Sequence, residues 1–197
     1  DAACGYLKQV CLNHQTYEGD LSKEADFKAY LETDRTGYDS DIKYYRWQIQ
    51  ADYANSTNAI KEILASRRAA GKQHITYYKA DGVTETEDMQ GFGTLQFMEV
   101  AERSASGSIH ALKLYFENGQ AKVQSEYNIR KVLGCGAKTI RYQDGSEGAC
   151  GSLLPSAACT LEKQADGAYI LRGGGYGHGL GMSQNGANGL AKAGYSY

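Results

Sequence analysis

A glycine-rich run that holds one histidine is the part of this sequence best suited to chemistry. Residues 173–184 read GGGYGHGLGMSQ, with six glycines among the first nine positions. Glycine is needed where the backbone takes positive φ or comes close to another group. His178 lies in the run beside Tyr176. Ser183 and Gln184 lead into a predicted helix, whose first N–H groups suit an anion or a sugar oxygen.

Three familiar glycine-loop motifs do not fit this run. It lacks the Gly-Lys-Ser/Thr of a Walker phosphate loop, and no register of its glycines gives G-x-G-x-x-G. Around Ser183 the residues are Gly181-Met-Ser-Gln-Asn185, so the second glycine of a nucleophile elbow is missing. Two interpretations stay open: a ligand-binding loop, or a tight connection in which His178 is a hydrogen-bonded spacer.

The end of the chain carries a resemblance to a known family. Residues 173–197 read GGGYGHGLGMSQNGANGLAKAGYSY, which resembles the C-terminal signature of the SpoIID/LytB family (stage II sporulation protein D-like). In that signature a short helix is preceded by the core G-x-G-x-G-H-G-x-G-M-[SC]-Q-x-G-A. The match in this chain runs from Gly175 to Ala187. Weaker agreement follows the family's order at Tyr6-Leu7 with Val10, Tyr45-Arg46-Trp47, residues 100–112, and Asn128 to Arg130 with Leu133.

The resemblance implies a bacterial cell-wall protein that acts on peptidoglycan glycan strands. The family includes lytic transglycosylases, which cut those strands, and LytB-like enhancers of cell-wall amidases. It implies an extracytoplasmic place in the cell envelope or wall, no cofactor and no metal. The partners are then glycan strands and, in the second case, an amidase. The substrate-binding residues that we carry over are Tyr6, Tyr45, Arg46, Trp47, Tyr176, His178, Ser183 and Gln184.

The family's catalytic acid has no counterpart here. A lytic transglycosylase needs an acid to protonate the glycosidic oxygen and then a base for the C6 hydroxyl, and one Glu can serve both steps. The family carries that Glu in an E-M-P context, whereas the only proline here, Pro155, follows Leu154. We therefore expect residues 1–197 to be a single SpoIID-like domain without the family's N-terminal segment and last strand, and we assign no catalytic residue. The alternative is a non-catalytic glycan-binding module that enhances an amidase.

Other reactive side chains have plainer interpretations. Glu99 and Glu102 fall in a predicted strand with a charged tail, so we expect solvated surface residues rather than an acid pair. His110 shares a predicted face with Leu112 and is expected to be partly buried. The aromatic faces of Trp47, Tyr44 and Tyr45 suit a sugar ring, but core packing is the expected role in so short an apolar cluster.

The five cysteines are an odd number, so two internal disulfides are the most that can form. Cys135 and Cys150 bracket a hairpin-like stretch and are the favoured pair, followed by Cys4 with Cys11. The latter two lie near His14, but the spacing lacks the C-x2-C or H-x3-H pairs typical of zinc sites.

Composition excludes two classes of partner. The 197 residues carry a formal net charge of -2 and a pI near 6.1, so they lack the basic face of a nucleic-acid binder. No stretch of 18 apolar residues exists, and we predict no membrane-spanning helix.

The elements that must position the loop follow from periodicity. We expect helices over 22–32, capped by Ser22, over 58–70, ended by Gly71, over 126–133 and over 182–193. Strands are expected over 75–79, 94–103, 108–116, 151–161 and 168–172, with a strand or packed loop over 44–53. Helices and strands do not alternate regularly. The prediction is therefore an α+β fold with a mixed, mostly antiparallel sheet and several short helices.

Overall fold

The computed structural model of the chain describes residues 19–33 and 37–195. The helices within this part are α1 (Glu24–Glu32), α2 (Thr57–Ala70), the 3-10 helix η1 (Lys72–His74), α3 (Glu126–Cys135) and α4 (Gln184–Lys192). The strands are β1 (Trp47–Ala51), β2 (Ile75–Lys79), β3 (Glu85–Thr86), β4 (Leu95–Arg103), β5 (Ile109–Phe116), β6 (Gly119–Gln124), β7 (Ala137–Tyr142), β8 (Glu147–Ala149), β9 (Cys159–Lys163) and β10 (Tyr169–Gly173).

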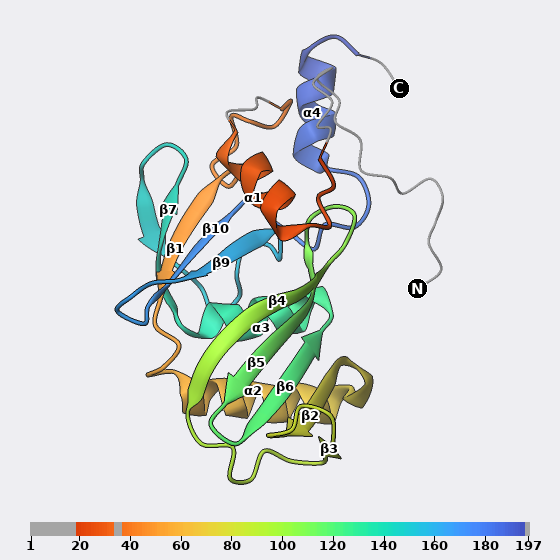
Figure 1. Cartoon of the computed structure of the whole chain (residues 1–197). Coiled ribbons are helices and arrows are strands. Elements are labelled where there is room, and N and C mark those ends of the chain that lie inside the picture. The colour runs from red at the N-terminus through yellow and green to blue at the C-terminus, as the bar shows by residue number, and fades with distance from the viewer. Residues whose placement is uncertain (1–18, 34–36, 196–197) are drawn as a thin grey trace.

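The strands form two five-stranded sheets, one above the other in Figure 1. Sheet A has the order β8-β7-β1-β10-β9, and sheet B has the order β3-β2-β6-β5-β4. The strand pairs in both are antiparallel. With the helices set apart from this pattern, the predicted α+β class is confirmed.

One apolar core runs through both sheets. Ile49 and Leu171 contribute to it from sheet A, Leu112 from sheet B and Leu64 from α2, and each of these side chains is at most 1% exposed. Helices α2 and α3 pack against each other and against sheet B, so this sheet has one face covered (Figure 1). The loops at the upper end of sheet A therefore project from a continuous packed body.

Most predicted elements are present, but several details differ from the prediction. Ser22 does not cap α1, because its hydroxyl donates to Asp20 and Lys23 occupies the cap position without a side-chain bond. Residues 151–158 are not strand; only Cys159 onward pairs with β10. Strand β6 was not expected, because its buried residues alternate as Gly119, Ala121 and Val123, which gives little hydrophobic signal.

The cysteines also differ from expectation. Cys135, Cys150 and Cys159 are free, so the favoured Cys135–Cys150 bridge is not formed, while Cys4, Cys11 and His14 lie outside the described residues. Burial raises the pKa of all three thiols, that of Cys159 to about 12. A thiol held in its neutral form is a poor nucleophile. None of the three is therefore activated for chemistry.

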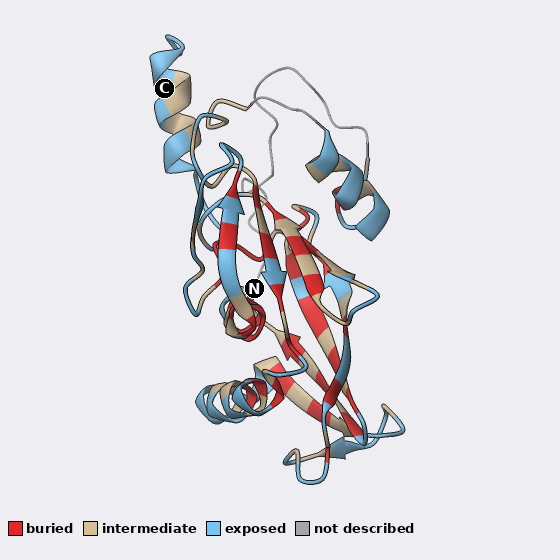
Figure 2. Ribbon diagram, turned by 90° about the vertical axis from the view of Figure 1, so that its left-hand side faces the viewer, coloured by how far each residue is buried: buried red, intermediate tan, exposed pale blue. Residues whose placement is uncertain are grey.

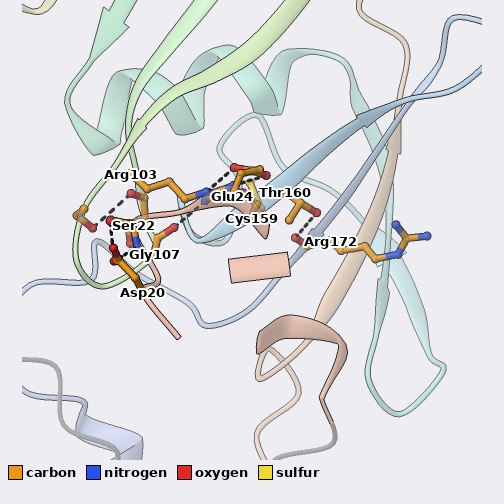
Figure 3. A network of polar contacts seen from close by, with 10 residues as sticks. Asp20, Ser22, Glu24, Arg103, Gly107, Cys159, Thr160 and Arg172 are labelled. Carbon is orange, nitrogen blue, oxygen red and sulfur yellow. Dashed lines mark hydrogen bonds and ion pairs between the residues drawn. The ribbon is translucent and has the colours of Figure 1, made fainter. Parts of the chain in front are cut away.

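A buried arginine joins the two sheets to α1. The Arg103 side chain is 1% exposed, and its guanidinium donates to both carboxylate oxygens of Glu24 at 2.6 and 2.8 Å. It also donates to the carbonyls of Gly107 and Cys159, and its charge lies 4.2 Å from the centre of the Phe27 ring. Figure 3 shows Glu24, Gly107 and Cys159 converging on the guanidinium. Strands β4 and β9 and helix α1 thus share one polar centre.

Helix α4 differs from the others in exposure. It stands at the upper end of the molecule and buries none of its residues (Figure 2). Contact with the body is made through Gly189, where a Cβ would lie 1.9 Å from the Tyr38 carbonyl oxygen. None of the helices in the described part of the chain has the length and apolarity needed to cross a bilayer.

Replacement of Arg103 tests how much the buried contact stabilises the fold. We expect Arg103→Met to lower the free energy of unfolding by about 3 kcal/mol, because two buried carbonyls and Glu24 lose their donor. Lys122→Met is the control, since Lys122 makes an exposed ion pair with Glu102 and should cost less than about 1 kcal/mol. Urea unfolding measures both, and equal losses would contradict the assigned role of Arg103.

Candidate functional site

The candidate site is the loop that follows β10, residues 174–183. Gly175, Gly177, Gly179 and Gly181 have φ values of 79°, 129°, 73° and 82°. These values lie in the region that side chains with a Cβ rarely adopt. Every second residue is thus left-handed, and the chain turns repeatedly over a short distance. The glycine spacing in the sequence has a conformational cause at these positions.

The first glycines of the run serve close packing instead. A Cβ at position 173 would lie 2.4 Å from the Trp47 ring and 2.8 Å from the Ala158 carbonyl oxygen. A Cβ at position 174 would lie 2.8 Å from the Tyr45 carbonyl oxygen. These glycines let the strand end lie directly against the segment before β1.

Backbone hydrogen bonds fix the near half of the loop. Gly175 donates to the Tyr44 carbonyl at 2.8 Å, and Gly177 donates to the Pro155 carbonyl at 2.8 Å. The Trp47 indole N–H donates to the Gly175 carbonyl at 3.2 Å. Trp47 is 3% exposed, so the expected core role holds and its ring face is not accessible to a sugar. The Trp47 side chain therefore supports the loop from the core of sheet A.

His178 lies in the far half of the loop and is exposed. Its Nδ1 accepts the Leu180 backbone N–H at 3.0 Å. A neutral imidazole that accepts at Nδ1 carries its proton on Nε2. Nε2 makes no hydrogen bond to any described residue. The loop therefore fixes one ring nitrogen and leaves the other as a donor for a ligand.

Tyr176 supplies an aromatic surface at the same place. Its side chain is 70% exposed, and its ring lies 4.6 Å from that of Tyr44, centre to centre. Tyr44 in turn meets Tyr142 edge-on at 5.1 Å, and the Lys43 ammonium lies 3.9 Å from the Tyr142 ring centre. Exposed ring faces of this kind can pack on the C–H face of a sugar. The sequence motif identified Tyr176, and Tyr44 was weighed as a sugar-stacking residue with core packing as its expected role, whereas Tyr142 was not identified.

Ser183 and Gln184 begin α4. The Ser183 hydroxyl oxygen accepts the Gly186 N–H at 3.0 Å and so caps the helix. This assigns Ser183 a structural role and fits the earlier exclusion of a serine elbow. Gln184 is exposed in the first turn, where helix N–H groups lack intrahelical partners.

Arg46 lies between the loop and the sheet. Its guanidinium donates to the Tyr45 carbonyl at 2.9 Å and lies 4.3 and 5.3 Å from the ring centres of Tyr45 and Tyr30. Burial raises the pKa of Tyr45, and the positive charge of Arg46 offsets part of that rise. Tyr45 and Arg46 thus lie beside the loop at Gly174, and their role in substrate binding stays a prediction. Tyr6 lies outside the described residues.

The other candidates lie elsewhere. Glu99 accepts the Tyr115 hydroxyl at 2.5 Å, a bond that raises the pKa of Tyr115 to about 12. Glu102 pairs with Lys122. Each carboxylate has its own partner, so they do not act as an acid pair. His110 is exposed rather than partly buried, because the buried residues of β5 are its neighbours Ile109 and Ala111.

No metal centre is evident in the described part of the chain. Among these residues, no group of three or more His, Cys, Asp or Glu side chains is placed to hold an ion.

Comparison with known proteins gives a family for the central part of the chain. The family model described as Domain of unknown function (DUF8618) matches residues 68–181, which is more than half of the chain. The chain belongs to this family. The DUF8618 match begins inside α2, includes all of sheet B and ends at Gly181, within the glycine loop. Comparisons with curated proteins and with solved structures found no match.

Substitution at Gly173 tests the packing under the loop. Gly173→Ala should lower the free energy of unfolding by about 2 kcal/mol, because the new methyl group meets the Trp47 ring and a backbone oxygen. Gly151→Ala is the matched control, since a Cβ there meets nothing within 4 Å. Thermal or urea unfolding would contradict this packing if both variants behaved alike.

Glu162 gives a pH dependence to the contact between α1 and sheet A. Its carboxylate lies 2.5 Å from the Lys28 ammonium and 2.6 Å from the Arg172 guanidinium, and these bonds hold its pKa below the ordinary value of 4.5. A carboxyl with a lowered pKa stabilises the fold fully above its unfolded-state value, and this contribution disappears as the pH falls through the lowered one.

The comparison of wild type with Glu162→Gln measures that contribution. The difference in unfolding free energy should be about 1 kcal/mol or less near pH 7, because all three side chains are partly exposed. It should shrink as the pH falls below 4.5. A difference that stays constant or grows in acid would contradict the assigned contacts.

Proposed function

We propose that this chain is a bacterial cell-wall domain that binds peptidoglycan glycan strands through the glycine loop, and that the full-length protein cleaves those strands as a lytic transglycosylase does. The observation that carries the proposal is the match to the SpoIID/LytB signature from Gly175 to Ala187, combined with a loop whose polar and aromatic groups face outward.

The loop chemistry suits a polar, ring-shaped ligand. Tyr176 offers a ring face, and His178 offers an Nε2–H donor of fixed tautomer. Gln184 adds an exposed amide next to the unpaired N–H groups at the start of α4. N-acetylated sugars present hydroxyl and carbonyl oxygens together with apolar C–H faces, so each group has a partner. The positive-φ glycines keep bulk away from this surface.

Cleavage needs a carboxylic acid, and the loop itself has none. Residues 173–184 contain neither Asp nor Glu. His178, Tyr176 and Gln184 are therefore assigned to binding and orientation of the glycan, and proton transfer to the glycosidic oxygen is left to a Glu of the full-length protein. Digestion of purified glycan strands with that protein should yield anhydro-sugar ends by mass spectrometry. Their absence would exclude transglycosylase cleavage.

The lack of an acid in the loop also favours a second candidate function, enhancement of a cell-wall amidase. A mixing assay separates the two. An amidase that releases peptide faster in the presence of this protein, without anhydro-sugar products, would identify an enhancer, and an unchanged rate would count against this alternative.

His178→Ala tests the binding role of the loop. We expect the affinity for tetra-N-acetylchitotetraose to fall about tenfold, as expected for loss of one well-placed hydrogen bond from a ligand. Stability should change little, because His178 is exposed. His110→Ala is the control, since His110 is exposed on β5 of sheet B. Calorimetry that finds equal affinities for both folded variants would reject a contact between His178 and glycan.

A further inference from the structure

A pocket with three arginines lies on sheet A beside the glycine loop. Its volume is about 240 Å³. Strands β7, β1 and β10 and the end of α1 form its walls. Among its lining residues, Arg46, Arg141 and Arg172 are cationic, and Glu32 is the one acidic side chain. An excess of guanidinium groups around a hollow of this size favours an anionic ligand.

Strand register places two of these arginines in one row. Gln48 of β1 pairs with Arg172 of β10 on one side and with Arg141 of β7 on the other. Directly paired residues of an antiparallel sheet share a face. The two arginines therefore flank Gln48 about 10 Å apart along the row, by the usual strand spacing. Figure 3 shows the Arg172 side chain extending away from the Arg103 centre.

The three arginines differ in how fully they are already paired. Arg172 binds Glu162, whereas Arg141 is exposed and makes no ion pair with any described residue. Arg46 is held by the Tyr45 carbonyl and two tyrosine rings, and its Nη2 is buried without a hydrogen-bond partner among the described residues. A buried guanidinium N–H without an acceptor is costly. An oxyanion in the pocket would supply that acceptor.

We propose that this pocket is an oxyanion-binding subsite that takes a carboxylate or phosphate group of a ligand. Guanidinium groups recognise such oxyanions through paired N–H donors, and both ligand types present oxygens at matching spacing. Arg46 provides a buried donor that lacks an acceptor, and Arg141 and Arg172 line the pocket from the two strands that flank β1. The subsite is distinct from the exposed face of Tyr176 and His178, and the proposal stands without the proposed function.

Three N-acetylated monosaccharides test the subsite by calorimetry. N-acetylmuramic acid carries a carboxylate, N-acetylglucosamine 6-phosphate carries a phosphate, and N-acetylglucosamine is the neutral control. At least one acidic sugar should bind about tenfold more tightly than the neutral one at low salt, with the advantage reduced at high salt. The acidic sugar that binds identifies the type of oxyanion. Equal binding of all three would overturn the proposal.

Two variants and one control locate the binding. Arg141→Gln should weaken binding of the acidic sugar about tenfold, because it removes a charged hydrogen bond. The control is Lys79→Gln, which makes the same charge change at the exposed end of β2 in sheet B. This variant should bind the acidic sugar as wild type does. Gln48→Glu places a carboxylate between Arg141 and Arg172 and should abolish binding by occupying both. Unchanged binding in Arg141→Gln and Gln48→Glu would overturn the proposal.

These variants also separate the subsite from glycan binding by the loop. Arg141→Gln should bind neutral tetra-N-acetylchitotetraose with the wild-type affinity, because Arg141 lies on β7 outside the loop. Loss of acidic-sugar binding alone in Arg141→Gln would therefore support the oxyanion subsite. Loss of neutral-glycan binding in His178→Ala would support glycan binding by the loop.

Discussion

The buried contact between Arg103 and Glu24 is the constraint on which the arrangement of this molecule depends. A guanidinium that is 1% exposed needs acceptors for its N–H groups, and the acceptors of Arg103 come from three separate parts of the chain. The bond from Arg103 to Glu24 fixes the start of α1, and the bond from Arg103 to the Cys159 carbonyl fixes the start of β9. Because α1 is also held by Glu162 through Lys28, its far end stays beside sheet A, where Glu32 lines the arginine pocket.

The glycine loop depends on a second fixed point at the end of β10, where Gly173 pairs with Cys159 of β9. Trp47 needs Gly173 beneath its ring and donates to the Gly175 carbonyl, so the core of sheet A leads directly into the loop. Tyr176 and His178 are both exposed on this loop. The glycine run thus combines positions that pack against the body with side chains that are open to solvent. The same tryptophan also lines the pocket in which the oxyanion subsite is proposed.

Local patterns predicted much of the fold. Helix α2 with its Gly71 end and strands β2 and β5 have strong periodicity, and they lie within one residue of the expected bounds. Strand β6 was missed because its core side is made of small residues. The Arg103–Glu24 contact joins residues 79 apart, and one sequence does not reveal which charges meet over that distance.

The site was predictable only in part, because its geometry also depends on contacts that form in the folded chain. The glycine motif indicated Tyr176 and His178, but the tautomer of His178 follows from a bond to Leu180 that exists only in the folded loop. Trp47 and Arg46 were indicated by resemblance. Only the structure shows that Trp47 is a buried support of the loop and that Arg46 is a cation beside the pocket. The pairing of Gln48 with Arg141 and Arg172 depends on the strand order β7-β1-β10, which periodicity does not give.

We propose that residues 176–184 form the surface that meets glycan. Amide chemical-shift mapping during titration with tetra-N-acetylchitotetraose tests this proposal. The largest shifts are expected at residues 176–184, with small shifts on sheet B. Shifts concentrated on sheet B, or none at saturating glycan, would contradict it.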